Sequence, residues 1–188
     1  MTVTPIRRAF TTETFDQWLG TYKLPHFQAL VFHGTGLPTR EMRNQSRANG
    51  VTILKWCDNL WHYWTEENGW HAGPHFVCDD EDILACTPPN IAGVGSPSWN
   101  GLGYLHLESA GDWNKELFWA TPTALNVIGA MASVFHAVGV APTATNLKFH
   151  NEDPATTHRD CPCHSGVLHK DDFIRAILAH PNWKRTHT

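Results

Sequence analysis

Residues 148–164, KFHNEDPATTHRDCPCH, concentrate side chains that bind metals or transfer protons. These side chains are His150, His158, Cys161, Cys163 and His164. Imidazole nitrogens and thiolates are the ligands that Zn2+ prefers in proteins, and a catalytic zinc has three of them plus one position for water. A structural zinc instead has four protein ligands. The first question is whether this stretch forms a whole site or needs a ligand from elsewhere.

The spacing argues for a site assembled from distant segments. CPC is too tight for a zinc knuckle, no second cysteine pair is present, and there is no HExxH motif. His33 ends a predicted strand over 27–35 and His150 ends one over 146–151, with Cys161 eleven positions further on. A single histidine on an apolar strand is more often a core residue, but His33 together with the 150–161 cluster favours a metal site.

The elements that would position these residues alternate between strands and helices. A hairpin is expected across Asp79 to Asp82, and a Gly- and Pro-rich exposed loop over 88–101. Thr121-Pro122 begins a helix that ends at Gly139. Further strands are predicted at 75–79, 82–86 and 103–109, and further helices at 51–69 and 170–180. This order predicts an α/β fold, a single domain with a central mixed β-sheet flanked by helices.

Composition excludes several classes of protein. The 188 residues are 41% hydrophobic and 17% charged, as in globular domains, and the formal charge of −4 gives no basic surface for nucleic acid. The apolar segment 124–141 contains Asn126, Ser133 and His136, so a packed helix is expected and not a membrane span. The N-terminus lacks the apolar stretch of a secretory signal, which predicts synthesis in the cytoplasm.

Five cysteines, an odd number, argue against a disulfide framework. Cys57, Cys78 and Cys86 lie in apolar surroundings and are expected to be buried, inert thiols. Cys161 and Cys163 differ because histidine and aspartate surround them. Cys163 is left with two possible roles, a spectator thiol or an alternative metal ligand.

Four segments carry a more specific resemblance: VFHGTG (31–36), GWHAGPHFVCDD (69–80), SWNGLGYLHLESAGDW (98–113) and FHNEDPATTHRDCP (149–162). Their order and character resemble the zinc-dependent N-acetylmuramoyl-L-alanine amidases, which include phage endolysins of the amidase type and peptidoglycan recognition proteins. The resemblance covers residues 27–180, which predicts a catalytic domain there, an N-terminal arm over 1–26 and a C-terminal tail over 181–188.

The resemblance implies roles for individual residues. One catalytic Zn2+ would be bound by His33, His150 and Cys161. Glu108 falls where many members have a catalytic glutamate, which would take a proton from water and pass it to the departing alanine nitrogen. Arg159 stands where relatives stabilise the oxyanion, and its neighbour His158 is a rival for that role.

The chain also departs from the family pattern. Pro74 replaces a tyrosine that many relatives have before His-Phe, Cys163 replaces the glycine of Cys-Pro-Gly, and the loop around Gly95 lacks a frequent histidine. The expected substrate-binding residues are Trp99, His75 and Trp70. Sugar rings stack well on indole, but with nine tryptophans in the chain a packing role is about as common for any one of them.

The implied activity is hydrolysis of the amide between N-acetylmuramic acid and L-alanine in peptidoglycan or muropeptides, by a monomeric phage or prophage endolysin. Such a protein would reach the cell wall through a holin-type pore. The main alternative is a non-cleaving peptidoglycan-binding protein of the same fold. Two others are an amidase that also binds a regulatory partner through residues 1–20, and a structural zinc protein with Cys163 or His164 as fourth ligand.

Overall fold

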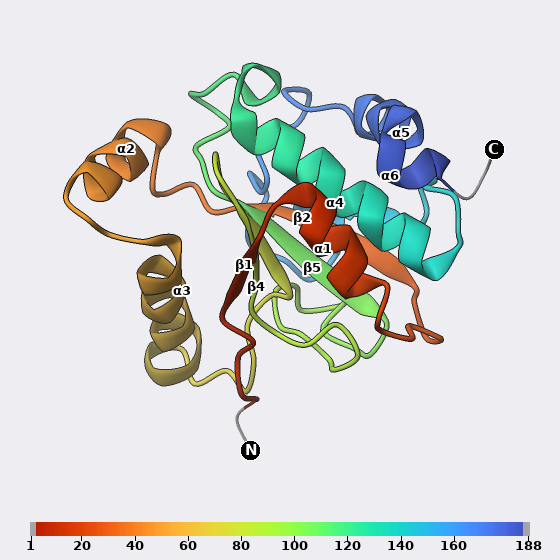
Figure 1. The fold of residues 1–188 in the computed structure, drawn as a ribbon, viewed down its shortest axis with the longest axis horizontal. Coiled ribbons are helices and arrows are strands. Elements are labelled where there is room, and N and C mark those ends of the chain that lie inside the picture. Colours follow the sequence, from red (N-terminus) through yellow and green to blue (C-terminus); the bar gives the residue numbers. More distant parts are fainter. Residues whose placement is uncertain (1–2, 186–188) are drawn as a thin grey trace.

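The computed structural model describes residues 3–185, and its centre is a mixed six-stranded sheet of order β1-β4-β3-β5-β2-β6 (Figure 1). Neighbours among β3, β5, β2 and β6 are parallel, whereas β4 is antiparallel to both β1 and β3. The strands are β1 (Arg8–Phe10), β2 (Ala29–Gly34), β3 (Phe76–Cys78), β4 (Ile83–Ala85), β5 (Tyr104–Ser109) and β6 (Leu147–Phe149). Helices cover both faces, so the predicted α/β fold is confirmed.

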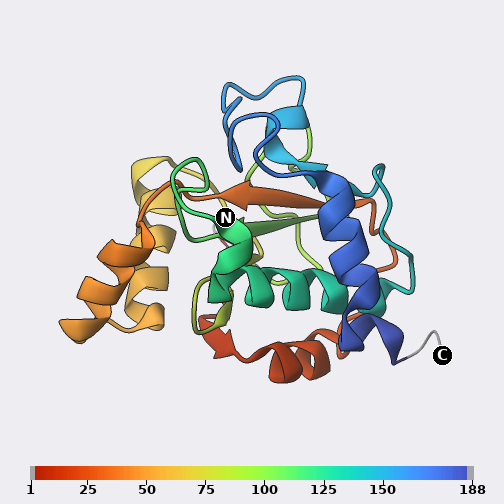
Figure 2. The same cartoon turned by 90° about the horizontal axis from the view of Figure 1, so that it is seen from above.

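One face of the sheet is covered by the long helix α4 (Pro122–Val138), with α1 (Thr12–Leu19), α5 (Lys170–Ala179) and α6 (Pro181–Lys184) packed against it. Figure 2 shows α4 running beneath the strands with α1 beside it. The ends of α4 are those expected from the sequence: the Thr121 side chain caps it, Pro122 begins it, and Gly139 follows with a positive φ of 66°.

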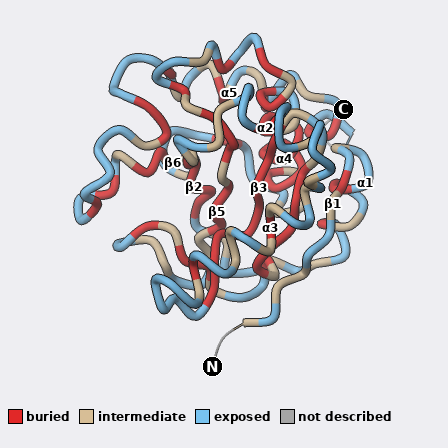
Figure 3. Tube along the Cα trace, turned by 90° about the vertical axis from the view of Figure 1, so that its left-hand side faces the viewer, coloured by how far each residue is buried: buried red, intermediate tan, exposed pale blue. Residues whose placement is uncertain are grey.

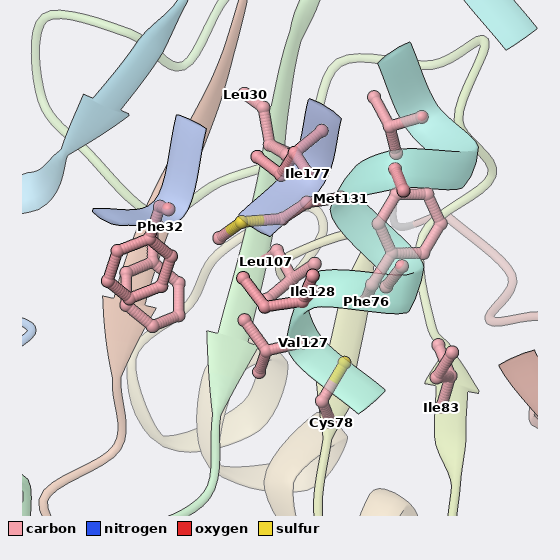
Figure 4. Close-up of a cluster of buried hydrophobic side chains, with 14 of the residues drawn as sticks. Leu30, Phe32, Phe76, Cys78, Ile83, Leu107, Val127, Ile128, Met131 and Ile177 are labelled. Carbon is pink, nitrogen blue, oxygen red and sulfur yellow. The ribbon is translucent and has the colours of Figure 1, made fainter. Parts of the chain in front are cut away.

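The alternation of side chains along the strands determines what each face contains. Leu30 and Phe32 of β2 and Leu107 of β5 point toward Ile128 and Met131 of α4 in the main core (Figure 4). In Figure 3 the buried segments run along these central strands and the exposed ones lie at the periphery. The intervening residues of β2 and β5, among them His33 and Glu108, therefore belong to the opposite face.

The opposite face is covered only in part by α3 (Ile53–His62) and the π-helical turn Tyr63–Glu67 that follows it. Cys57 and Trp64 from this segment pack against Val77 and Leu84. Gly69 then has a φ of 67°, as expected for a glycine that ends a helix. The rest of this face, over β5, β2 and β6, is covered by loops.

Parts of the expected N-terminal arm and C-terminal tail are elements of the domain. Phe10 of β1 and Phe15 of α1 are buried in the main core, as is Trp183 of α6. β1 and α6 were not predicted because three and four residues are too few to show a periodic pattern. The signal for α1 was present and missed, since Phe15, Trp18 and Leu19 follow the cap residue Thr11 at helical spacing. Residues 1–2 and 186–188 of the arm and tail lie outside the described residues.

Helix α2 (Arg40–Ala48) was also not predicted, because REMRNQSRA has no apolar stripe. Its buried residue is Arg43, whose guanidinium lies 3.3 Å from Asp80 and donates to the carbonyl of Pro38 at 2.9 Å.

Between residues 3 and 185, no helix combines the length and apolar character that crossing a membrane requires.

Candidate metal centre and active site

Three donors converge at the carboxyl end of the parallel strands. His33 is near the end of β2, His150 directly follows β6, and Cys161 returns on the loop between β6 and α5. Their ligand atoms all lie within 4.8 Å of one another, and Cys161 Sγ is 4.0 Å from His33 Nδ1. Adjacent parallel strands end at the same edge of a sheet, which is why residues 117 positions apart in sequence (33 and 150) become neighbours.

Gly34 allows the loop that carries Cys161 to approach β2. A Cβ at this position would lie 2.7 Å from the carbonyl oxygen of Pro162 and 2.9 Å from the Trp113 ring. The Gly34 backbone instead donates to Cys161 Sγ at 3.5 Å. The absence of a side chain at Gly34 therefore helps to place the thiol beside His33.

The protonation preferences of the three donors fit a zinc site. Burial lowers the pKa of His150 to about 4 and, with the nearby His106 and His150, holds the pKa of His33 well below its usual value. Both imidazoles are thus neutral and able to donate a lone pair. Burial also raises the pKa of the Cys161 thiol, so a thiolate there requires an adjacent cation, which zinc provides to its ligands.

Among residues 3–185, no fourth protein ligand belongs to this group. Cys163 is buried in the hydrophobic core, and His164 is exposed with its Nδ1 2.5 Å from Asp160 Oδ1. With three donors, the group fits a catalytic zinc site with an open position and not a closed structural one. Of the two roles left open for Cys163, its burial favours the spectator thiol.

Glu108 lies beside the three donors. It is paired with His33 in the register of β5 and β2, and its Oε1 is 4.0 Å from His33 Nδ1. Oε2 is buried and has no hydrogen-bond partner among the described residues. Burial raises the pKa of the carboxyl group to about 8, so near neutral pH it can both accept and release a proton.

Two further histidines extend inward from His33. His33 Nε2 is 3.1 Å from His106 Nδ1, and His106 Nε2 is 3.0 Å from the carbonyl oxygen of Trp99. The backbone N–H of His106 donates to His75 Nδ1 at 2.9 Å, and His75 Nε2 is 3.0 Å from the carbonyl oxygen of Ile91. Both rings are fully buried, and burial lowers the pKa of His106 to about 3 and that of His75 to about 4.

The loop over 88–101 lies on this histidine chain and is buried in part, although its composition predicts an exposed loop. Gly93, Val94 and Ser96 are buried. A Cβ at Gly95 would lie 2.7 Å from His106 Nδ1 and 3.3 Å from His33 Nε2, directly over their hydrogen bond. Small residues such as Gly95 usually indicate a flexible loop, but here they let the loop backbone pack closely against the histidine rings.

Asp153 joins this loop to the segment that carries His150. Its carboxylate accepts hydrogen bonds from Ser98 N at 2.9 Å and Ala155 N at 2.8 Å, and from the hydroxyl groups of Ser96 and Ser98. Burial alone would raise the pKa of Asp153, but these hydrogen bonds lower it to about 2. The side chain is therefore ionised at neutral pH and connects the two loops around the site.

The two candidates for oxyanion stabilisation have different positions. The Arg159 guanidinium donates to the carbonyls of Asp153 and Pro154, each at 3.2 Å, and so supports its own loop. His158 is exposed, and its ring stacks on that of His150 at a centroid distance of 5.5 Å. Both residues are exposed, and His158 is the one whose ring contacts a member of the donor group.

The three residues expected to bind substrate are in unlike surroundings. Trp99 is half-buried beside the site, where it stacks on Tyr104 and has Lys148 Nζ 5.6 Å from its ring. Trp70 is 36% exposed in the segment leading into β3, at the opposite end of the parallel strands from His33. His75 is 0% exposed with both ring nitrogens bonded inside the protein, so its ring has no surface for a substrate.

The sequence reading missed His106, Gly95 and Asp153. A signal existed for His106, because it is two residues before Glu108 on a strand and must point to the same face. Asp153 lies within the 148–164 cluster, but no sequence motif indicated a role for it. The hydroxyl partners of Asp153, Ser96 and Ser98, are 57 and 55 positions away in sequence, and the ring partner of His106, His33, is 73 positions away, so no local pattern reveals either contact.

Solved structures with this fold are peptidoglycan amidases and peptidoglycan recognition proteins. The amidase LysC from Clostridium intestinale URNW has a TM-score of 0.58 at 20% identity, over 81% of this chain and 85% of its own. Drosophila PGRP-LB has a TM-score of 0.54 at 19% identity, over 86% and 87%. Peptidoglycan recognition protein LE, solved with monomeric diaminopimelic acid-type peptidoglycan, has 0.57 at 16% identity, over 97% and 91%.

No protein-family model matches the chain, and no curated protein matches it in sequence. The likeness to the solved structures is therefore one of fold. At that level, the resemblance drawn from the four sequence segments is confirmed.

Proposed function

We propose that this protein is a zinc-dependent N-acetylmuramoyl-L-alanine amidase that acts on bacterial peptidoglycan or its fragments. The observation that carries the proposal is the group of His33, His150 and Cys161 within 4.8 Å of one another, with the Glu108 carboxyl 4.0 Å from His33. It occurs in a fold shared with solved amidases of this specificity.

The three donors would bind one Zn2+, which when bound polarises a carbonyl group and lowers the pKa of a water molecule. Glu108 would accept a proton from the attacking water and deliver it to the departing L-alanine nitrogen. Burial raises the pKa of the Glu108 carboxyl group and so favours its protonated form, which supports its role in delivering a proton to the departing nitrogen. Its unpartnered Oε2 is an acceptor that water or substrate can satisfy.

For the developing oxyanion we assign His158 in preference to Arg159. Both side chains are exposed, but the His158 ring stacks on His150, whereas the two terminal guanidinium nitrogens of Arg159 donate to loop carbonyls. For sugar or peptide binding we retain Trp99, because it borders the site and offers an aromatic face. Loss of one oxyanion donor typically lowers the rate about 10²–10³-fold.

A second function is supported by one of the solved structures. Peptidoglycan recognition protein LE was solved with a bound peptidoglycan monomer, so this fold also serves recognition. A protein of that kind would bind muropeptides without cleaving them. The intact set of three donors with an adjacent carboxyl favours the amidase.

Mass spectrometry of purified peptidoglycan after incubation with the protein tests the proposal. We expect free stem peptides that begin at L-alanine, lost when a zinc chelator is added and restored by added zinc. Intact stems in every sample, together with one tightly bound zinc per chain, would support the binding protein instead. A phage endolysin role, with passage to the cell wall through a holin-type pore, is tested separately by expression in a host with and without a holin.

A further inference from the structure

His106 is a fully buried histidine that neither touches the expected substrate nor belongs to the metal-ligand group. Its ring lies between His33 and the backbone of the loop above it. His106 Nδ1 is 3.1 Å from His33 Nε2, and His106 Nε2 is 3.0 Å from the Trp99 carbonyl oxygen. Its place in this chain of hydrogen bonds determines what it can do.

We propose that His106 is a positioning residue that, held by the Trp99 carbonyl, fixes the tautomer of His33 so that Nδ1 of His33 is the nitrogen that binds the metal. This inference rests on the zinc site of the proposed function. It concerns which nitrogen of His33 carries the hydrogen before the metal binds. His106 itself contacts neither metal nor substrate.

The protons follow from donor and acceptor rules. A carbonyl oxygen only accepts, so His106 Nε2 must carry the hydrogen. The ring is fully buried, and among the described residues its two nitrogens contact only His33 Nε2 and the Trp99 carbonyl oxygen, so it has no carboxylate within hydrogen-bonding distance to balance a positive charge. It therefore carries one hydrogen, on Nε2, and its Nδ1 is an acceptor. Only the N–H of His33 Nε2 can satisfy it, which leaves the lone pair of His33 on Nδ1.

The geometry on the other side of His33 agrees with this assignment. Nδ1 is the His33 nitrogen that lies 4.0 Å from Cys161 Sγ and 4.0 Å from Glu108 Oε1. A hydrogen on Nδ1 would point into the group of donors and oppose a cation there. The buried bond to His106 keeps the hydrogen on the opposite side of the ring.

The groups that hold His106 in place come in part from the loop over 88–101. Its backbone N–H donates to His75 Nδ1, and the Ile91 carbonyl orients His75 by the same rule. Ile91 and Trp99 thus supply two carbonyls from one loop, and Gly95 lies over the bond between His33 and His106. Partners of metal-binding histidines in such positions typically change metal affinity 10–100-fold when removed.

The experiment has a readout that is independent of activity and of metal. Long-range 1H–15N correlation spectra of the metal-free wild-type protein report the tautomer of each histidine, and we expect His33 to be protonated on Nε2. Zinc affinity is then measured by competition with a chromophoric chelator. His106→Leu, which removes the acceptor, should bind zinc about 10–100-fold more weakly.

Two variants separate positioning from a general effect on the fold. His106→Asn places an amide oxygen where Nδ1 was and should recover part of the lost affinity. His136→Leu makes the same change on α4, where the ring pairs with Asp16, and should leave zinc affinity unchanged. Thermal unfolding of all variants shows whether each one is folded.

A His33 ring protonated on Nδ1 in the metal-free wild type would overturn the proposal, whether or not His106→Leu folds. So would a folded His106→Leu protein with wild-type zinc affinity. A wild-type protein with the expected tautomer and zinc affinity but no cleavage of peptidoglycan would contradict the amidase and leave this inference standing. A wild type that binds no zinc would contradict the proposed function.

Discussion

His33 and Glu108 face each other across the parallel strands β2 and β5, with Nδ1 and Oε1 4.0 Å apart. The pairing places a nitrogen of the donor group and a half-buried carboxyl group on the same face of the sheet. Because both residues are on central strands, their separation is determined by the strand register and not by a mobile loop. The chemistry proposed for the site depends on this fixed relationship.

Glu108→Gln should abolish most turnover while zinc remains bound. The amide has nearly the shape of the carboxyl group but cannot transfer the proton, and general acid–base groups typically contribute about 10²–10⁴-fold. Stem-peptide release and bound zinc are measured together. The control is Glu66→Gln on the exposed π-helical turn, which should retain full activity. Undiminished turnover in Glu108→Gln would remove this residue from the mechanism.

Cys161→Ser should weaken zinc binding, because a hydroxyl group is a much poorer zinc ligand than a thiolate. The matched control is Cys163→Ala, two residues away, whose thiol lies in the hydrophobic core and outside the donor group. Chelator competition should show lower affinity for the first variant and wild-type affinity for the second. The reverse result would make Cys163 the ligand.

Gly95→Ala should lower zinc affinity, since the added Cβ would lie 2.7 Å from His106 Nδ1 and must displace the loop or the ring. Gly101→Ala is the control in the same loop, because its Cβ would meet Tyr104 at 3.9 Å, an ordinary contact. Zinc competition and thermal unfolding of both variants check this prediction. Equal behaviour of the two would show that the loop does not press on the histidine chain.

The metal-free protein should lose stability as the pH falls from about 6.5 toward about 4. His75 has its pKa lowered from 6.5 to about 4 by burial, so across this range the unfolded chain binds a proton that the folded chain does not. Stability is fully present above 6.5, and roughly 3 kcal/mol is lost at lower pH through this residue.

Urea unfolding at a series of pH values measures this dependence. In His75→Asn, an amide oxygen can replace Nδ1 as acceptor of the His106 N–H, and the titrating group is gone. The slope of the free energy of unfolding against pH gives the number of protons taken up on unfolding, and this number should be lower by about one in that variant. An unchanged slope would assign the pH dependence to other groups.

Local patterns in the sequence were enough to predict the fold class and the ends of several elements. Thr121, Pro122 and Gly139 mark the ends of α4, and the turn between 79 and 82 joins β3 to β4. The chain also placed His33 and His150 at strand ends, where a shared sheet edge brings them together. These features could be predicted because caps, turns and strand alternation depend on residues a few positions apart.

The surroundings of the donors depended on the tertiary structure. The contact between His106 and His33, the connection of two loops by Asp153 and the partial burial of the loop over 88–101 all depend on segments distant in sequence. The same holds for His75, which was expected to bind substrate and is fully buried. The sequence by itself determined which residues could bind a metal. The packing of loops on the sheet decided which nitrogen of His33 faces Cys161 and Glu108, because hydrogen-bond partners depend on position in space.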